Sequence, residues 1–407
     1  MRDRGVVFWV FMLSACALLA IGRVYDERLT FANINLAIII SGFYIVSVIY
    51  ILLTIKKIIL SKTKVVFYLF YLAVLVINPI LWLVFDVTEF GIHNFINFGL
   101  IIVPISVVVM EKYSTKDVLS TFYILLTVSC VLAVLSSIGL SLSERADGRM
   151  ATLGGGPIVF ARWMGFGIIS LFLLPTDIKS RYKYIFILFF FILALASGSR
   201  GPILSLCLTG LVYVFLNFNQ VIVKVSLGVC LLMSVLYFSG LGKQLSEVGK
   251  MDRVLMNISK KGGSLQSTSA RKHLAVSSLI MLQNYPLGVG AGNWRNMSNK
   301  LRPNHLTPDT LEYPHNLFLE VACEYGIQTL ILILLLFLYV FHLSYSKMTK
   351  YNSDKSSLYP VLFYLLVFFS LNSLVSGMLN DSRLLFLVIS MILIHEPLIS
   401  KKYVNHL

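Results

Sequence analysis

An arginine in a glycine-rich turn is the first residue whose surroundings suit phosphate chemistry. Arg200 lies in the run Ser197-Gly198-Ser199-Arg200-Gly201-Pro202, between two long apolar segments. The small neighbours let a backbone approach a ligand closely, and a planar guanidinium binds phosphate oxygens in pairs. The alternative is a long side chain that simply reaches the membrane interface. We favour anion binding for Arg200.

A second arginine follows Ser267-Thr268-Ser269, with Ser269 as the predicted N-cap of a helix over 270–283. Arg271 would then lie in the first turn, where free backbone N–H groups and the helix dipole favour an anion. The alternative is a solvated basic face shared with Lys272 and His273. If Arg271 and Arg200 share a membrane face, together they suit a pyrophosphate.

A histidine stands where a long polar segment meets the next apolar run. His315 lies in Tyr313-Pro314-His315-Asn316, and an imidazole there can accept a proton near neutral pH, as a general base must. The alternative role is helix capping, which Asn316 could perform equally well. Glu320 and Glu324 follow on one helical face. One of them could orient His315 or bind an acceptor hydroxyl, with exposure at the interface as the alternative.

Two glycine-rich segments are weaker candidates. The run Gly288-Val289-Gly290-Ala291-Gly292-Asn293-Trp294 follows a predicted helix instead of a strand, which argues against a dinucleotide fingerprint. A tight loop is favoured over a sugar-binding turn built on Trp294. The run Gly154-Gly155-Gly156-Pro157 could break a span to admit a ligand, with Arg149 and Arg162 as secondary candidates for the same anionic site.

The elements that must position these residues are membrane helices. The chain has 407 residues, of which 57% are hydrophobic and 13% charged, and this charged fraction is about half that of soluble proteins. Apolar runs of about 17 to 25 residues recur throughout, each long enough to cross a bilayer. We therefore expect an all-α integral membrane protein. The predicted spans are 6–21, 31–55, 65–85, 92–110, 118–140, 157–174, 184–198, 202–217, 221–240, 317–343, 358–379 and 383–398.

The distribution of basic residues predicts the orientation. With the N-terminus inside, the inside segments hold 17 Lys and Arg, whereas the short outside loops hold six. Lys and Arg concentrate in cytoplasmic loops. About twelve spans with both termini in the cytoplasm follow, and this topology places Arg200, Arg271 and His315 on the outer face.

One long segment, 241–316, is the only candidate for a folded region outside the membrane. It separates nine predicted spans (1–240) from three spans and a short cytoplasmic tail (317–407). It carries ten Lys and Arg against four Asp and Glu, a formal charge of +6. This charge implies an anionic partner at the membrane surface, or simply lipid headgroups. Apolar residues between 245 and 258 predict an amphipathic surface helix.

Several function classes are disfavoured by what is missing. No Asp-x-Asp pair occurs, so a metal-bridged nucleotide-sugar site is not supported. There is no P-loop, and the predicted cytoplasmic loops are too short for a nucleotide-binding domain. We therefore expect no cofactor, no metal site and no nucleic-acid partner. No internal repeat is visible, and the candidate residues gather at one face, which argues against a transporter of lipid-linked glycans.

Taken in order, short motifs of the chain resemble the O-antigen ligase and polymerase superfamily over about 185–345. The matching segments are Ser197-Gly198-Ser199-Arg200-Gly201, Ser269-Ala270-Arg271, Tyr285-Pro286-Leu287-Gly288-Val289-Gly290, His315-Asn316 and Gly326-Ile327. The chain departs from the family at Thr329, where a second glycine is common, and this departure bears mainly on local helix packing.

The resemblance implies a metal-independent membrane glycosyltransferase at the periplasmic face of the bacterial inner membrane. Its donor would be a glycan on undecaprenyl pyrophosphate. By resemblance, Arg200 and Arg271 hold the pyrophosphate, and His315 activates the acceptor hydroxyl. By the same resemblance, the glycine-rich 288–294 segment favours a polymerase of surface polysaccharide repeat units, with a chain-length regulator as a candidate partner. The alternative is an O-antigen ligase that transfers the glycan to lipid A-core.

Overall fold

The protein is a helical assembly in the computed structural model, which describes residues 5–21, 30–31, 34–138, 156–175, 178–217, 264–301, 313–351, 354, 356–395 and 397–399. Its α-helices are α1 (Val6–Ile21), α2 (Leu36–Leu53), α3 (Lys62–Leu81), α4 (Glu89–Asn97), α5 (Val103–Lys112), α6 (Thr115–Ser137), α7 (Pro157–Leu173), α8 (Ser180–Ala196), α9 (Arg200–Leu216), α13 (Ser264–Asn284), α14 (Trp294–Leu301), α15 (Leu317–Lys350), α16 (Tyr359–Ser376) and α17 (Arg383–Ile392).

The remaining elements are short. A π-helical stretch, η2 (Phe98–Ile102), joins α4 to α5, and a 3₁₀ turn, η3 (Asn380–Ser382), precedes α17. Two antiparallel strands of two residues each, β1 (Thr30–Phe31) and β2 (Ile34–Asn35), lie before α2. Asn35 ends this hairpin and caps α2, because its Oδ1 accepts a hydrogen bond from the Ala37 amide at 2.9 Å.

Eleven of the twelve predicted spans fall on described helices, and the span predicted at 221–240 lies outside the described residues. Among the described residues, six helices can cross a membrane by length and composition: α2, α3, the continuous run from α4 to α5, α6, α15 and α16. Three shorter apolar helices are α1, α7 and α9. A multi-pass membrane protein is therefore supported, whereas the count of about twelve spans is not confirmed.

The last predicted span is wrong in its extent. The apolar run 383–398 forms a helix of only ten residues, α17, which ends at Ile392. At 1.5 Å per residue it is about half the thickness of a hydrocarbon layer. After the helix the chain turns back, and the Leu358 amide donates to the Leu398 carbonyl at 3.0 Å. Apolar composition alone does not reveal where a buried helix ends.

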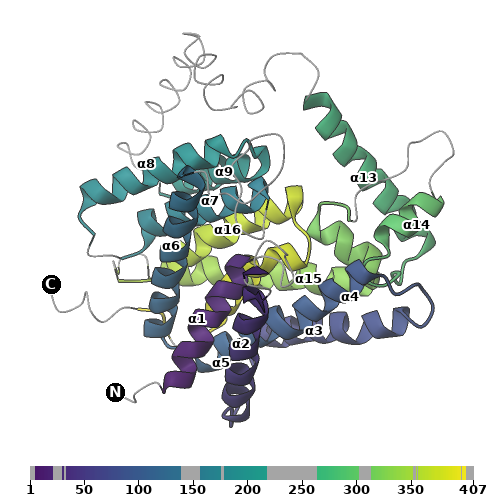
Figure 1. The fold of residues 1–407 in the computed structure, drawn as a ribbon, viewed down its shortest axis with the longest axis horizontal. Coiled ribbons are helices and arrows are strands. Elements are labelled where there is room, and N and C mark those ends of the chain that lie inside the picture. The colour runs from purple at the N-terminus through teal and green to yellow at the C-terminus, as the bar shows by residue number, and fades with distance from the viewer. Residues whose placement is uncertain are drawn as a thin grey trace.

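The core of the molecule is built around α16. In this helix 78% of the 18-residue window is buried, as expected for a helix that is apolar on all sides. It packs against α7, α9, α15 and α17, and Figure 1 shows it at the centre of the assembly in yellow. On one flank α13 and α14 lie together beside α15 (Figure 1).

Helix ends that were predicted to share a membrane side meet in the structure. Lys64 at the start of α3 pairs with Glu111 at the end of α5, with 2.8 Å between Nζ and Oε1. On the opposite side, Arg383 at the start of α17 donates from Nη1 to the Leu18 carbonyl near the end of α1, at 3.1 Å. Both contacts agree with the alternating helix directions of the predicted topology. Which side is cytoplasmic stays a prediction.

Candidate functional site

His315 has an unusual backbone and a half-buried ring. Its φ is +55°, the only positive value at a non-glycine residue among those the structure describes, and histidine is one of the residue types that tolerates this region. Asn316 performs the capping: its Oδ1 accepts from the amides of Phe318 at 2.9 Å and Leu319 at 3.1 Å. The imidazole is thus not needed for the cap. It packs against the Tyr313 ring at 4.3 Å between centroids.

Charged groups from three other elements surround His315. Burial lowers the pKa of the imidazole below its ordinary value of 6.5; the positive charges of Arg271 and Arg162 lower it further, while Asp381 raises it. A neutral imidazole is the form that accepts a proton. The arrangement therefore keeps His315 in its basic form at neutral pH.

The two predicted anion-binding arginines lie close enough to repel one another. Part of the Arg271 side chain is exposed to solvent. The protein around the rest of it lowers the pKa of the guanidinium by desolvation, and the positive charge of Arg200 lowers this pKa further. Arg200 stands at the first residue of α9, and Arg271 lies within α13. Because two adjacent like charges are relieved by a bound anion, this pair suits a ligand with two or more negative charges.

The predicted position of Arg271 in the first turn of its helix is wrong. The helix begins at Ser264, five positions before the predicted N-cap Ser269. Arg271 therefore lies in the second turn or beyond, where backbone N–H groups are already used within the helix. A helix N-terminus contributes nothing to an anion at Arg271. The guanidinium itself and its proximity to Arg200 remain as the favourable features.

Arg162 is buried within α7 and links three elements. Its Nη2 donates to the Ser376 carbonyl at 3.0 Å and to the Ser376 hydroxyl at 3.1 Å, and its Nη1 reaches the Asp381 carbonyl at 3.5 Å. These bonds fix the end of α16 and the η3 turn against α7. Arg162 thus occupies a structural position beside the site while its charge still acts on His315.

Glu320 and Glu324 are not exposed, so the interface alternative is wrong for both. Their exposed fractions are 2% and 1%. Glu320 Oε2 accepts from the Leu379 amide at 2.8 Å, and Glu324 Oε1 accepts from the Gly292 amide at 2.9 Å. Each carboxyl group therefore holds a loop against α15. An interaction of either residue with His315 or an acceptor hydroxyl stays a prediction.

The glycine-rich segment is a packed loop, as favoured from the sequence. Gly288, Gly290 and Gly292 have φ values of +94°, +84° and +77°. The Gly290 amide donates to the Glu324 carbonyl at 2.8 Å, beside a kink in α15 where Gly326 has φ +84°. The loop and the kink thus fit one another.

The sugar-binding alternative for this segment is wrong as far as Trp294 is concerned. Its ring is fully buried, with 0% exposure, and its Nε1 donates to the Ser278 hydroxyl at 3.0 Å. Trp294 therefore joins α14 to α13 and offers no face to a sugar.

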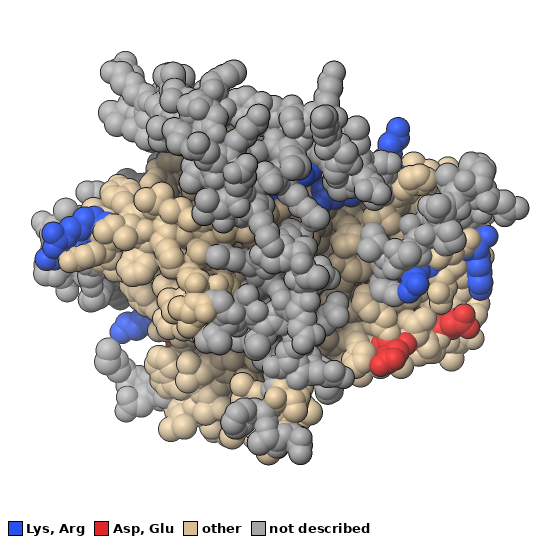
Figure 2. Space-filling view, turned by 45° about the horizontal axis from the view of Figure 1, so that its top comes forward, with Lys and Arg blue, Asp and Glu red and all other residues tan. Residues whose placement is uncertain are grey.

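Other predicted features cannot be placed. Two sets of predicted features lie outside the described residues. They are Arg149 with Gly154 and Gly155, and the amphipathic helix predicted over 245–258. The division of the chain at 241 and 316 also stays a prediction. Figure 2 shows a face that is mostly uncharged where it is described, with separate patches of Lys and Arg and of Asp and Glu.

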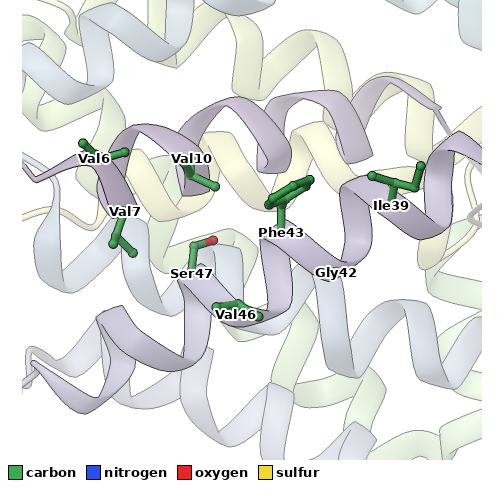
Figure 3. A pocket seen from close by; sticks show the side chains of 8 residues that line it. All are labelled: Val6, Val7, Val10, Ile39, Gly42, Phe43, Val46 and Ser47. Atoms are coloured by element: carbon green, nitrogen blue, oxygen red, sulfur yellow. The ribbon is translucent and has the colours of Figure 1, made fainter.

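A cavity of about 470 Å³ lies away from these residues, between α1 and α2. Figure 3 shows its lining, which consists of aliphatic side chains, Phe43, Gly42 and Ser47. The Ser47 hydroxyl already donates to the Tyr44 carbonyl at 2.8 Å. This apolar cavity offers no group that could act on a sugar or a phosphate, so we do not place chemistry there.

Part of the chain matches a known protein family. Residues 184–334 match the O-antigen ligase family. The matched segment holds Arg200, Arg271 and His315, and it confirms the resemblance to the O-antigen ligase and polymerase superfamily. The O-antigen ligase match covers less than half of the chain and does not distinguish ligases from polymerases. No curated protein matches the chain.

Asp381 was not among the candidate residues predicted from the sequence. Asp381 lies in the short connection between α16 and α17, and its charge acts on His315. The signal available was an acid in a turn on the predicted outer side. Its proximity to His315 depends on how α15 and α16 pack, which no local motif reveals. Among the described residues, no group of three or more His, Cys, Asp or Glu could hold a metal ion.

Proposed function

We propose that the chain is a membrane glycosyltransferase that polymerises oligosaccharide repeat units carried on undecaprenyl pyrophosphate. One observation carries this proposal: Arg200, Arg271 and His315 come from three separated segments of the chain and lie close together in the fold. Arg200 is near enough to lower the pKa of Arg271, and Arg271 is near enough to lower the pKa of His315. The match to the O-antigen ligase family supports the same reaction class. The predicted topology puts the site at the periplasmic face of the bacterial inner membrane.

In the proposed reaction the two guanidinium groups hold the pyrophosphate of the donor. His315 takes the proton of the acceptor hydroxyl, and the hydroxyl oxygen forms a bond to the anomeric carbon. The bond from that carbon to the pyrophosphate oxygen breaks, and undecaprenyl pyrophosphate leaves with the electron pair. Attack from the opposite face inverts the anomeric configuration. The arginines stabilise charge that grows on the leaving group.

The second candidate is ligation of the glycan to lipid A-core. The description of the matching family as O-antigen ligase favours it, whereas the glycine-rich 288–294 segment favours polymerisation by resemblance. Both reactions use the same donor and the same bond changes, and they differ only in the acceptor. A chain-length regulator is a further candidate partner for the polymerase.

The arginine pair is tested with the purified full chain in vesicles that contain an undecaprenyl-pyrophosphate-linked oligosaccharide repeat. We expect Arg200→Lys and Arg271→Lys each to lower the transfer rate by about 10²-fold, because lysine loses the bidentate contact to phosphate. Arg181→Lys, an exposed arginine on α8, is the matched control and should react as the wild type does. Wild-type rates in both site variants would contradict the proposal.

A further inference from the structure

The rings of Phe90 and Tyr313 form an aromatic surface next to His315, which we call the ledge. The Phe90 ring of α4 stacks on the Tyr313 ring at 6.4 Å between centroids and an angle of 9°, and Tyr313 packs in turn against His315 at 4.3 Å. All three rings are half-buried, so each keeps part of its surface accessible. The C–H faces of a sugar ring pack well against such aromatic surfaces.

Two asparagine amides adjoin this ledge. Asn94 lies one helical turn after Phe90 on the same face of α4, and Asn380 in η3 donates from Nδ2 to Asn94 Oδ1 at 3.1 Å. Asn94 Nδ2 and Asn380 Oδ1 have no hydrogen-bond partner among the described residues, although both atoms are buried. Asn380 itself is only 4% exposed.

The unpaired atoms point to a particular kind of ligand. One of them is a hydrogen-bond donor and the other is an acceptor. If the oxygen and nitrogen positions were exchanged in both side-chain amides, one donor and one acceptor would still be unpaired. A buried polar atom without a partner is unfavourable, because it has lost its hydrogen bonds to water. A ligand that supplies the missing hydrogen bonds removes this penalty. A hydroxyl group donates and accepts at once. Aromatic faces next to such an amide pair therefore fit a neutral sugar.

The ledge and the arginine pair approach His315 from different elements. The ledge comes from α4, the segment before α15 and the η3 turn, whereas Arg200 and Arg271 come from α9 and α13. Asp381, which follows Asn380 directly, acts on His315. A sugar on the ledge would therefore lie against elements that do not carry the arginines, with a hydroxyl next to the imidazole.

We propose that Phe90, Asn94, Tyr313 and Asn380 form the subsite for the acceptor sugar. This proposal rests on the proposed function and adds the positions of the two substrates. The nucleophilic sugar lies on the ledge, and the donor pyrophosphate lies at the arginines. The chemical class of the acceptor is an uncharged sugar ring with free hydroxyl groups.

The test measures sugar binding and pyrophosphate binding separately, on the full chain in detergent. A panel of methyl glycosides is the probe for the ledge, read by saturation-transfer difference NMR. Farnesyl pyrophosphate is the probe for the arginines. We expect at least one glycoside to bind the wild type and to bind Phe90→Ala and Asn94→Ala at least fivefold more weakly, while farnesyl pyrophosphate binds all three alike. Phe43→Ala, an exposed aromatic residue of α2 with 62% exposure, should bind both probes normally.

Each failure has a distinct meaning. The subsite is overturned if no glycoside binds the wild type, or if Phe90→Ala and Asn94→Ala bind glycosides as the wild type does. The proposed function is contradicted instead if farnesyl pyrophosphate binds Arg200→Ala as tightly as the wild type. Melting temperatures of the variants close to that of the wild type establish that lost binding is not lost folding.

Discussion

The imidazole of His315 depends on neighbours that lie far away in the sequence. Its motif and its position before an apolar run were enough to predict a general base. Burial is the main cause of its lowered pKa, and the charged groups that also act on it, Arg271, Arg162 and Asp381, come from α13, α7 and the turn after α16. Tertiary packing brings them together, so no reading of the Tyr313-Pro314-His315-Asn316 run could have predicted the direction of the pKa shift.

The lowered pKa of His315 predicts the pH dependence of transfer. Protonated imidazole cannot accept a proton, so activity is present above the folded-state pKa and is lost as the pH falls through it. Because burial and two positive charges lower that pKa below 6.5, the acid limb of the rate profile should lie below pH 6.5. Asp381→Asn removes the charge that raises the pKa and should move the limb to still lower pH. A limb above 6.5 in the wild type would refute this assignment.

Asn316 gives a prediction about stability at the residue scale. Its side chain caps α15 and its Nδ2 donates to the Leu374 carbonyl at 2.9 Å, which ties α15 to α16. We expect Asn316→Ala to cost about 1–2 kcal/mol through the lost cap. Asn316→Asp keeps the acceptor for the amides and should lose less. Equal melting temperatures for the alanine variant and the wild type, in thermal unfolding in detergent, would show that the cap is unimportant.

At the scale of elements, apolar runs predicted the helices well and their ends less well. The helix starts at Lys62, Pro157 and Arg200 agree with the predicted starts to within a few residues. The end of α17 at Ile392 lies six residues before its predicted end. The kink in α15 was not predicted. It arises because the 286–292 loop bonds to backbone groups that a straight helix would use itself, as in the Ile327 amide that donates to the Pro286 carbonyl at 2.9 Å.

Gly292 tests the packing of this loop. Its φ is +77°, and an added Cβ would collide with Thr88 Oγ1 and lie 2.5 Å from the Gly91 amide nitrogen. We expect Gly292→Ala to destabilise the protein by at least about 2 kcal/mol, from backbone strain and from the collision with α4.

The matched control is Gly210→Ala in α9. An added Cβ there meets nothing within 4 Å, and alanine is the better helix former, so this variant should melt at or slightly above the wild-type temperature. Equal melting temperatures for the two variants would mean that the loop is not packed against α4 as described.

At the scale of the whole molecule, the alternation of basic residues predicted which helix ends lie together, as the Lys64–Glu111 pair illustrates. The number of spans could not be predicted with the same accuracy. A buried helix of ten residues such as α17 and a full span look alike in apolar composition, because both are surrounded by hydrocarbon-like material. The orientation follows from charge alone and is therefore a separate prediction.

Cysteine labelling measures that orientation. In a variant whose native cysteines are replaced, Lys300→Cys on α14 should react with a membrane-impermeant maleimide in spheroplasts. Lys57→Cys, between α2 and α3, should react only after the membrane is permeabilised. Both lysines are exposed in the structure, so accessibility to water does not differ between them. The reverse pattern would place the site at the cytoplasmic face and refute the topology.

The central claim is that His315 activates the acceptor in glycan transfer. The most direct measurement is a lipopolysaccharide gel of a strain lacking the gene, complemented with the wild type, His315→Ala or His342→Ala. His342 is an exposed histidine of α15, and its variant should restore the full ladder. At equal protein levels, His315→Ala should leave core with a single repeat for a polymerase, or bare core with accumulated lipid-linked polymer for a ligase. A full ladder from His315→Ala would contradict the account.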